Sequence, residues 1–162
     1  MSVQRLRRGE LIAGASGAAL VVFLFAVHWY HVNATFAPTL GGGLHARTTW
    51  TGWQALTYVR WLLLVTALAA LALTYFQAVE RAPAIPVTLA VITTVLGGLS
   101  ALALIARVID TPGNGLGRSA GVYLALAAAI GIAYGGFASL REEDGPDPAA
   151  LDIETVRLPG PT

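Results

Sequence analysis

The sequence predicts an all-α membrane protein in which four transmembrane helices form an up-down-up-down bundle. Composition is the first indication, because 56% of the 162 residues are hydrophobic and 12% are charged, whereas a soluble domain is about a quarter charged. Distribution is the second, because the apolar residues gather in four stretches close to the roughly 20 residues that a helix needs to cross a bilayer. The expected spans are residues 11–30, 55–76, 85–109 and 120–140.

Helix is the expected conformation of each span because a backbone exposed to lipid must satisfy its own hydrogen bonds. The first span has an alternative interpretation as a cleaved secretory signal, since Arg5, Arg7 and Arg8 precede it. The apolar part of such a signal is typically about 7–15 residues long and is followed by a small-residue cleavage site. The greater length of residues 11–30, without a clear A-x-A site after them, favours a retained transmembrane helix.

Three connections and two terminal segments surround these spans. Residues 31–54 form a polar, Gly-rich loop, and the other two connections read as short turns because they contain Pro or Gly clusters. Residues 1–10 form a basic N-terminus. Residues 141–162 form an acidic tail with several prolines, which predicts disorder.

The distribution of arginine predicts that both termini are cytoplasmic. All ten basic residues are arginine, and the cytoplasmic flanks of membrane helices are enriched in such residues. With N-in and C-in orientation the inner flanks carry Arg5, Arg7, Arg8, Arg81, Arg141 and Arg157. The outer flanks carry Arg47, Arg60, Arg107 and Arg118. The arginine, alanine and glycine bias also indicates a GC-rich bacterial genome, so the expected location is a bacterial plasma membrane.

Aromatic residues cluster at the expected span boundaries. Trp29 and Tyr30 close the first span, and Trp50, Trp53 and Trp61 surround the start of the second. Amphipathic rings gather at the headgroup level of a bilayer. Interfacial anchoring is therefore the favoured interpretation of the four tryptophans, and stacking on a ligand is the alternative.

Small residues recur at a spacing of four in the spans. The clearest series is in the fourth span, where Gly131, Gly135 and Ser139 follow Ala127, and the third span contributes Gly97. Helices in lipid associate through small residues that allow close approach, because lipid removes the hydrophobic driving force between them. These residues are expected to be helix contacts, either within one chain or between two copies.

Charged residues collect at the expected outer ends of the helices. Arg60, Arg107, Asp110 and Arg118 all fall there under N-in topology. One interpretation is a site for an anion or a lipid headgroup. The favoured interpretation is that the long arginine side chains reach toward the interface, with Arg107 pairing with Asp110.

A metal site is a weaker alternative at the same end. His28 and His31 are three residues apart and would share a helix face, and His45 in the first loop could be a third ligand. Zinc sites need three or four well-placed ligands with supporting partners. No Glu accompanies these histidines, so no metal or other cofactor is expected.

Several function classes are excluded by what the chain does not contain. It has no cysteine, and the four spans contain no Asp or Glu, which argues against thiol chemistry and against proton coupling through a membrane carboxylate. The net charge of +1 is too small to suggest nucleic-acid binding. The expected function is therefore non-enzymatic: a structural protein or accessory subunit in the lipid bilayer, with a membrane-protein partner or a second copy. The alternative is a small transport or binding component with the anion or headgroup site described above.

Short motifs give the chain a layout that resembles a group of uncharacterised four-span actinobacterial membrane proteins. The motifs are Arg8-Gly9-Glu10, the aromatic pair Trp29-Tyr30, Trp53-Gln54-Ala55, and Leu-Arg-Glu-Glu at 140–143. The resemblance covers roughly residues 5–143. It implies the four-span topology and no particular activity.

Overall fold

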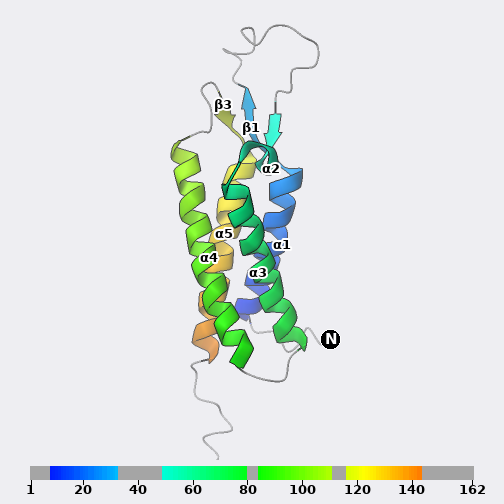
Figure 1. Ribbon diagram of the computed structural model, residues 1–162, viewed down its shortest axis with the longest axis vertical. Coiled ribbons are helices and arrows are strands. Elements are labelled where there is room, and N and C mark those ends of the chain that lie inside the picture. The colour runs from blue at the N-terminus through cyan, green and yellow to red at the C-terminus, as the bar shows by residue number, and fades with distance from the viewer. Residues whose placement is uncertain (1–7, 33–48, 80–83, 111–115, 144–162) are drawn as a thin grey trace, which may run out of the picture.

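The computed structural model describes residues 8–32, 49–79, 84–110 and 116–143. Four long helices lie side by side along its long axis (Figure 1): α1 (Arg8–Ala26), α3 (Val59–Val79), α4 (Ala84–Ile109) and α5 (Ala120–Glu143). One end carries a short helix and three short strands: α2 (Gly52–Ala55), β1 (His28–Val32), β2 (Thr49–Thr51) and β3 (Leu116–Arg118).

Each long helix contains a stretch that is long and apolar enough to cross a membrane. The sequence-based prediction of a mostly helical chain with four candidate membrane spans is therefore confirmed. Helix α4, the predicted third span, begins at Ala84, and helix α5, the predicted fourth span, begins at Ala120; both lie at or next to the predicted residues. Helix α5 continues to Glu143. The second begins at Val59 rather than at residue 55, because Gly52–Ala55 forms the separate helix α2.

The predicted end of the first span was wrong. Helix α1 stops at Ala26, and residues 28–32 form strand β1 instead of a last helical turn. The segment His-Trp-Tyr-His-Val consists largely of aromatic and β-branched residues that suit a strand, and partner strands from two later connections satisfy its backbone. The fold is thus mostly helical with a small sheet, and not purely α.

Strand β1 is the centre of the sheet and pairs antiparallel with β2 on one side and with β3 on the other. Tyr30 lies opposite Trp50 in β2 and opposite Arg118 in β3. The β1–β2 register shifts between His28 and Tyr30. Neighbouring side chains of a regular strand point to opposite faces, so burial of two in succession is unusual where one face is open to solvent. Trp29 and Tyr30 are nevertheless both fully buried, and the register shift lies at these residues.

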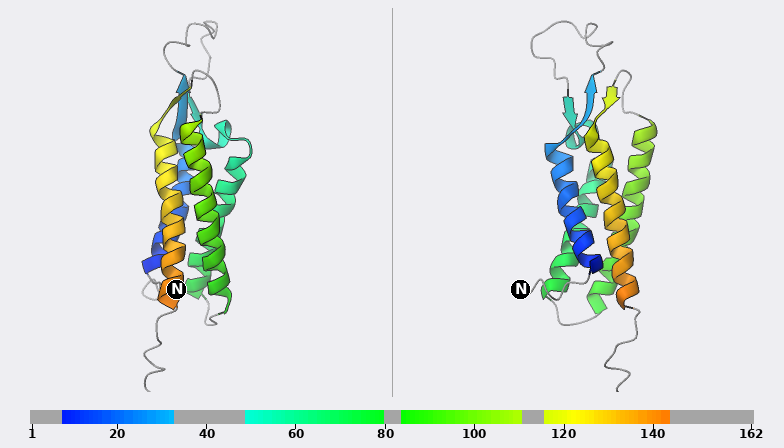
Figure 2. Two further views of the ribbon diagram at one scale, coloured as in Figure 1. Left: turned by 90° about the vertical axis from the view of Figure 1, so that its left-hand side faces the viewer. Right: turned by 180° about the vertical axis from the view of Figure 1, so that it is seen from behind.

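The four long helices contact one another in a ring. Helix α1 packs against α3 and α5, and α4 packs against the same two helices. In Figures 1 and 2 the C-terminal ends of α1 and α4 and the N-terminal ends of α3 and α5 lie at the end that carries the sheet. The sheet therefore joins segments that are far apart in the sequence at one end of the helices.

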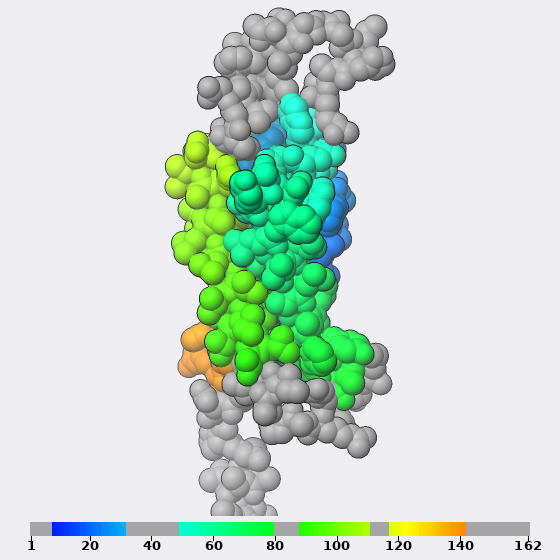
Figure 3. Space-filling view, in the orientation of Figure 1, coloured from blue at the N-terminus to red at the C-terminus, as the bar shows by residue number. Residues whose placement is uncertain are grey.

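The outer surface of the helices differs from that of a soluble protein. Among the described residues, the interior is mostly apolar and also holds four fully buried Ser and Thr side chains: Thr66, Thr93, Ser100 and Ser139. Large apolar side chains are exposed on all four long helices, including Phe25, Leu68, Leu102 and Ile130. Figure 3 shows the broad surface formed by α3 and α4 on one side of the molecule. An exposed apolar surface of this extent is what a hydrocarbon environment requires.

The predicted small residues lie at helix contacts. A Cβ built on Gly135 of α5 would lie 2.5 Å from the backbone nitrogen of Ala13 in α1, and one built on Gly97 of α4 would lie 2.7 Å from the nitrogen of Ala133 in α5. A Cβ on Gly131 would collide with the hydroxyl of Ser16 in α1. Ser139 is fully buried, whereas Ala127, the first residue of the predicted series, is exposed. These contacts are all within one chain.

Candidate functional site at the sheet-bearing end

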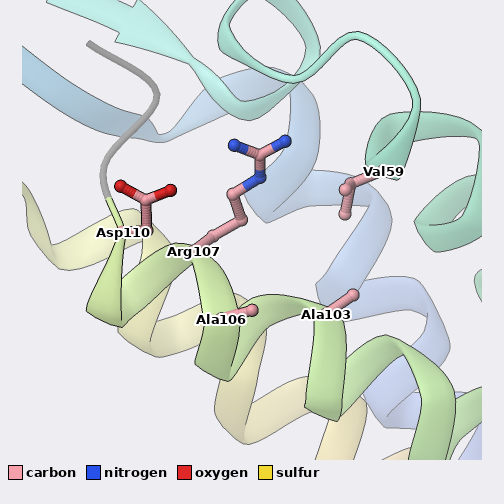
Figure 4. Close-up of a pocket in the computed structure, with 5 residues that line it drawn as sticks. All are labelled: Val59, Ala103, Ala106, Arg107 and Asp110. Atoms are coloured by element: carbon pink, nitrogen blue, oxygen red, sulfur yellow. The ribbon is translucent and has the colours of Figure 1, made fainter.

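A pocket of about 410 Å³ opens between α3 and α4 near the sheet. Among the described residues, its lining consists of Val59 at the start of α3, Ala103, Ala106 and Arg107 near the end of α4, and Asp110 directly after α4 (Figure 4). The two alanines follow one another at helical spacing, so they leave room where larger side chains would fill the space. The volume falls within the range of small-molecule sites.

Arg107 and Asp110 place opposite charges on the wall of this pocket. Arg107 in the last turn of α4 and Asp110 directly after that helix both point toward the strands (Figure 4). The ion pair expected between them is not formed: within the parts of the chain that the structure describes, neither side chain makes an ion pair. Each charge is therefore available to a group that enters the pocket.

Tyr30 is fully buried and lies close enough to Arg107 and Arg118 for their charges to act on it. Its hydroxyl has no hydrogen-bond partner among the described residues. Burial raises the pKa of the Tyr30 phenol above its ordinary value of 10.0, and the nearby positive charges of Arg107 and Arg118 partly oppose this rise in pKa. A buried donor without a partner is costly, so the Tyr30 hydroxyl is an unsatisfied polar group within the electrostatic influence of Arg107 and Arg118.

Arg118 closes the end of α4. Its Nη2 donates a hydrogen bond of 3.1 Å to the carbonyl oxygen of Ile109, the last residue of that helix. Arginine side chains commonly bind the otherwise unpaired carbonyls at a helix C-terminus. Arg118 thus ties β3 to α4, and its charge remains near Tyr30.

Arg60 is separated from the pocket although its neighbour Val59 lines it. The Arg60 guanidinium lies 5.0 Å from the ring centre of Trp53 and 5.7 Å from that of Trp61, and its Nη1 donates to the carbonyl oxygen of Trp53 at 3.3 Å. Its Nε is buried and has no partner among the described residues. Contacts of this kind with indole rings stabilise a guanidinium. The predicted set of four charged residues therefore divides into two locations.

The tryptophans do not share one role. Trp61 and Tyr58 are exposed, at 53% and 84%, and fit the predicted interfacial belt. The prediction is wrong for Trp29, which is fully buried and whose indole N–H donates to the carbonyl oxygen of Phe23 at 2.7 Å. Gly52 and Gly121 lie against its ring: a Cβ on either would be 2.5 Å from an indole carbon. Trp29 is the central packing residue of the sheet-bearing end.

The proposed sharing of a helix face by His28 and His31 was also wrong. Both residues are exposed and belong to strand β1, so the spacing of three no longer aligns their side chains. His45 lies outside the described residues. Within the described ranges no group of three or more potential metal ligands occurs.

Sequence reasoning found the charged residues of the pocket and missed the others. Arg107 and Asp110 stand out because charge is rare near the end of an apolar helix. Val59, Ala103 and Ala106 carry no such signal, and Tyr30 was assigned to the membrane interface. Predicting the position of Tyr30 would have required predicting that residues 28–32 form a strand paired with β2 and β3.

Comparisons with known proteins do not assign this chain to a family. No family model matches it, and neither the curated proteins nor the solved structures include a significant match.

Proposed function

We propose that the chain is a multi-pass integral protein of a bacterial plasma membrane, with its four long helices forming an up-down-up-down bundle whose termini are both cytoplasmic. The observation that carries this proposal is the outer surface of the four long helices, on which many large apolar side chains are exposed. Arginines favour the cytoplasmic side, and the sheet-bearing end, with Tyr58 and Trp61, becomes the outer end.

Labelling of single cysteines tests this orientation, since the natural chain has no cysteine. Tyr58 directly precedes α3 and Val79 is its last residue, so these two exposed side chains mark opposite ends of the helix. In intact cells a membrane-impermeant maleimide should label Tyr58→Cys and should label Val79→Cys only after permeabilisation. The reverse pattern would mean the opposite orientation, and labelling of both variants in intact cells would contradict a membrane-spanning chain.

Within this class, the proposed role is non-enzymatic, as a structural or accessory subunit. Support comes from the apolar outer surfaces of all four helices, which can contact partner helices as well as lipid. Cross-linking in native membranes from a photoreactive group at Leu102, which is 64% exposed on α4, tests this role. One defined cross-linked protein, or a dimer of the chain, is the expected result. Cross-links to lipid alone would contradict the role.

The pocket favours a second candidate, a binding component for an anionic group at the outer rim. It presents Arg107, which forms no ion pair with another described residue, to a space of about 410 Å³. A phosphate-bearing ligand should raise the thermal unfolding temperature of the purified protein in detergent, and Arg107→Gln should abolish that rise. A panel of phospholipids that stabilises both proteins equally would rule this function out.

A further inference from the structure

The pocket between α3 and α4 holds one positive and one negative side chain that do not neutralise each other. A simple anion bound to Arg107 would be repelled by Asp110, and a simple cation bound to Asp110 would be repelled by Arg107. A ligand that carries both charges a few ångströms apart satisfies both side chains at once. The charge pattern therefore selects a zwitterion over a singly charged ion.

The other described residues that line the pocket are apolar. In Figure 4, Ala103 and Ala106 lie on α4 below the charged pair, and Val59 lies beside the pair at the start of α3. Exposed apolar side chains of α4, such as Leu99 and Leu102, continue the surface toward the middle of the helix. A ligand with a charged head and a long apolar extension matches this sequence of surfaces.

The depth of the pocket in the proposed bilayer also indicates a ligand with a charged head and an apolar extension. Tyr58 and Trp61 are exposed at the same end of α3 as Val59, and such aromatic side chains gather where the headgroups of a bilayer lie. Arg107 and Asp110 are at the corresponding end of α4. The charged part of the pocket is therefore at the depth of a phospholipid headgroup.

We propose that this pocket binds the phosphoethanolamine headgroup of a phospholipid, with the phosphate on Arg107, the ammonium on Asp110 and an acyl chain along the apolar surface between α3 and α4. The proposal rests on the second candidate function above and names its ligand class. Arginine binds phosphate oxygens through paired N–H donors, and a primary ammonium donates hydrogen bonds to a carboxylate. A headgroup with a trimethylated nitrogen cannot donate those bonds, and a glycerol headgroup leaves Asp110 facing a net negative charge.

Native mass spectrometry of the purified full chain in detergent tests the proposal. The probes are phosphatidylethanolamine, phosphatidylcholine and phosphatidylglycerol with identical acyl chains, and soluble phosphoethanolamine as a headgroup without chains. Phosphatidylethanolamine should bind most tightly, by about tenfold or more, since a hydrogen bond to a charged group is worth that much in affinity. Soluble phosphoethanolamine should bind far more weakly, because the apolar surface then contributes nothing.

Variants assign the two charges. Arg107→Gln should weaken binding of all three lipids, whereas Asp110→Asn should remove the preference for phosphatidylethanolamine and leave phosphatidylglycerol bound as well or better. Arg141→Gln is the matched control, because Arg141 is an exposed arginine at the opposite end of the molecule. Circular dichroism and elution volume establish that each variant is folded, and Arg107→Lys retains the charge if Arg107→Gln does not fold.

The outcomes separate this proposal from the function on which it rests. Equal binding of the three lipids that still depends on Arg107 would overturn the headgroup assignment and leave a binding function in place. Soluble phosphoethanolamine binding as tightly as the lipid would overturn the lipid as its source. Lipid binding that is the same in Arg107→Gln as in the natural chain would overturn both.

Discussion

Glycine permits close packing in two regions of this molecule, but the partner differs. Between α1 and α5, Gly9 and Gly135 face backbone: a Cβ on Gly9 would lie 2.6 Å from the nitrogen of Ser139, and one on Gly135 would lie 2.7 Å from the carbonyl oxygen of Gly9. At the sheet-bearing end, Gly52 and Gly121 instead face the indole of Trp29. One region brings helices together, and the other encloses a large side chain.

The difference follows from the surroundings proposed for each region. Helices in hydrocarbon gain nothing from burying apolar surface, so their contact depends on the dispersion forces that close approach allows. Near water, burial of an aromatic ring is itself favourable. The α1–α5 contact should therefore tolerate no added volume, whereas the sheet-bearing end should depend on the volume that Trp29 supplies.

The largest loss of stability is expected from Gly135→Leu. The added side chain meets the backbone of α1, which cannot move aside without separating the helices. Overpacking typically costs about 1–3 kcal/mol, and a collision with backbone belongs at or above the upper end of that range. We expect loss of a monodisperse species in detergent, measured by size-exclusion chromatography and thermal unfolding. Gly98→Leu is the control, because a Cβ at Gly98 meets nothing within 4 Å. Equal unfolding temperatures for the two variants would contradict the proposed packing.

The next effect is expected from Trp29→Ala. Removing a fully buried indole costs about 3–5 kcal/mol through lost contacts and the remaining cavity. The loss should concern the sheet-bearing end, so near-ultraviolet circular dichroism should change while the helical far-ultraviolet signal remains. Trp61→Ala provides the comparison, because that indole is 53% exposed. If both substitutions lower the unfolding temperature equally, Trp29 does not organise this end.

The contrast between the two regions also explains what the sequence could predict. The four candidate spans depend on the local length of apolar stretches, so α4 and α5 were found nearly to the residue. Strand β1 was missed because its partners, residues 49–51 and 116–118, are remote in the sequence and short. A local reading of Trp29 and Tyr30 therefore continued the helix and placed both rings at the interface.

The candidate site was predicted only where charge revealed it. Arg107 and Asp110 were identified by their rarity at the end of an apolar helix, but their ion pair was not found. The sequence groups Arg60 with these two residues because all three fall at the expected outer ends of their helices. The direction in which the side chain turns decides its partners, and Arg60 turns to Trp53 while Val59 borders the pocket. The backbone of α2 and the start of α3 fix that direction.

Tyr30→Phe is expected to raise the stability, by less than the substitutions of Gly135 and Trp29 lower it. The substitution removes a buried hydroxyl without a partner among the described residues and keeps the ring. Relief of an unsatisfied polar group should increase the free energy of unfolding by about 1 kcal/mol. Chemical or thermal unfolding in lipid-free detergent measures this gain. A decrease in stability would show that the hydroxyl has a partner in solution.

The pH dependence of the same variant gives an independent check. The unfolded chain releases the phenolic proton near the ordinary pKa of 10.0, whereas the folded chain retains it to higher pH because burial raises the pKa of Tyr30. Stability contributed by this group is thus complete below pH 10 and falls as the pH rises above it. Tyr30→Phe should show a shallower fall in the alkaline range, and identical profiles would place Tyr30 in contact with water.

The smallest effect is expected between α3 and α4, where two hydroxyl side chains form a hydrogen bond between the helices. The Thr66 and Ser100 hydroxyl oxygens are 2.7 Å apart, and the Thr66 hydroxyl also lies 2.8 Å from the Leu62 carbonyl oxygen of its own helix. Because each hydroxyl can return to its own helix when the other is lost, a double-mutant cycle of Thr66→Val and Ser100→Ala should give a coupling of only about 0.6 kcal/mol, typical of hydrogen bonds between membrane helices. A coupling several times larger would mean that hydroxyl pairing, and not close approach of small residues, holds this pair of helices together.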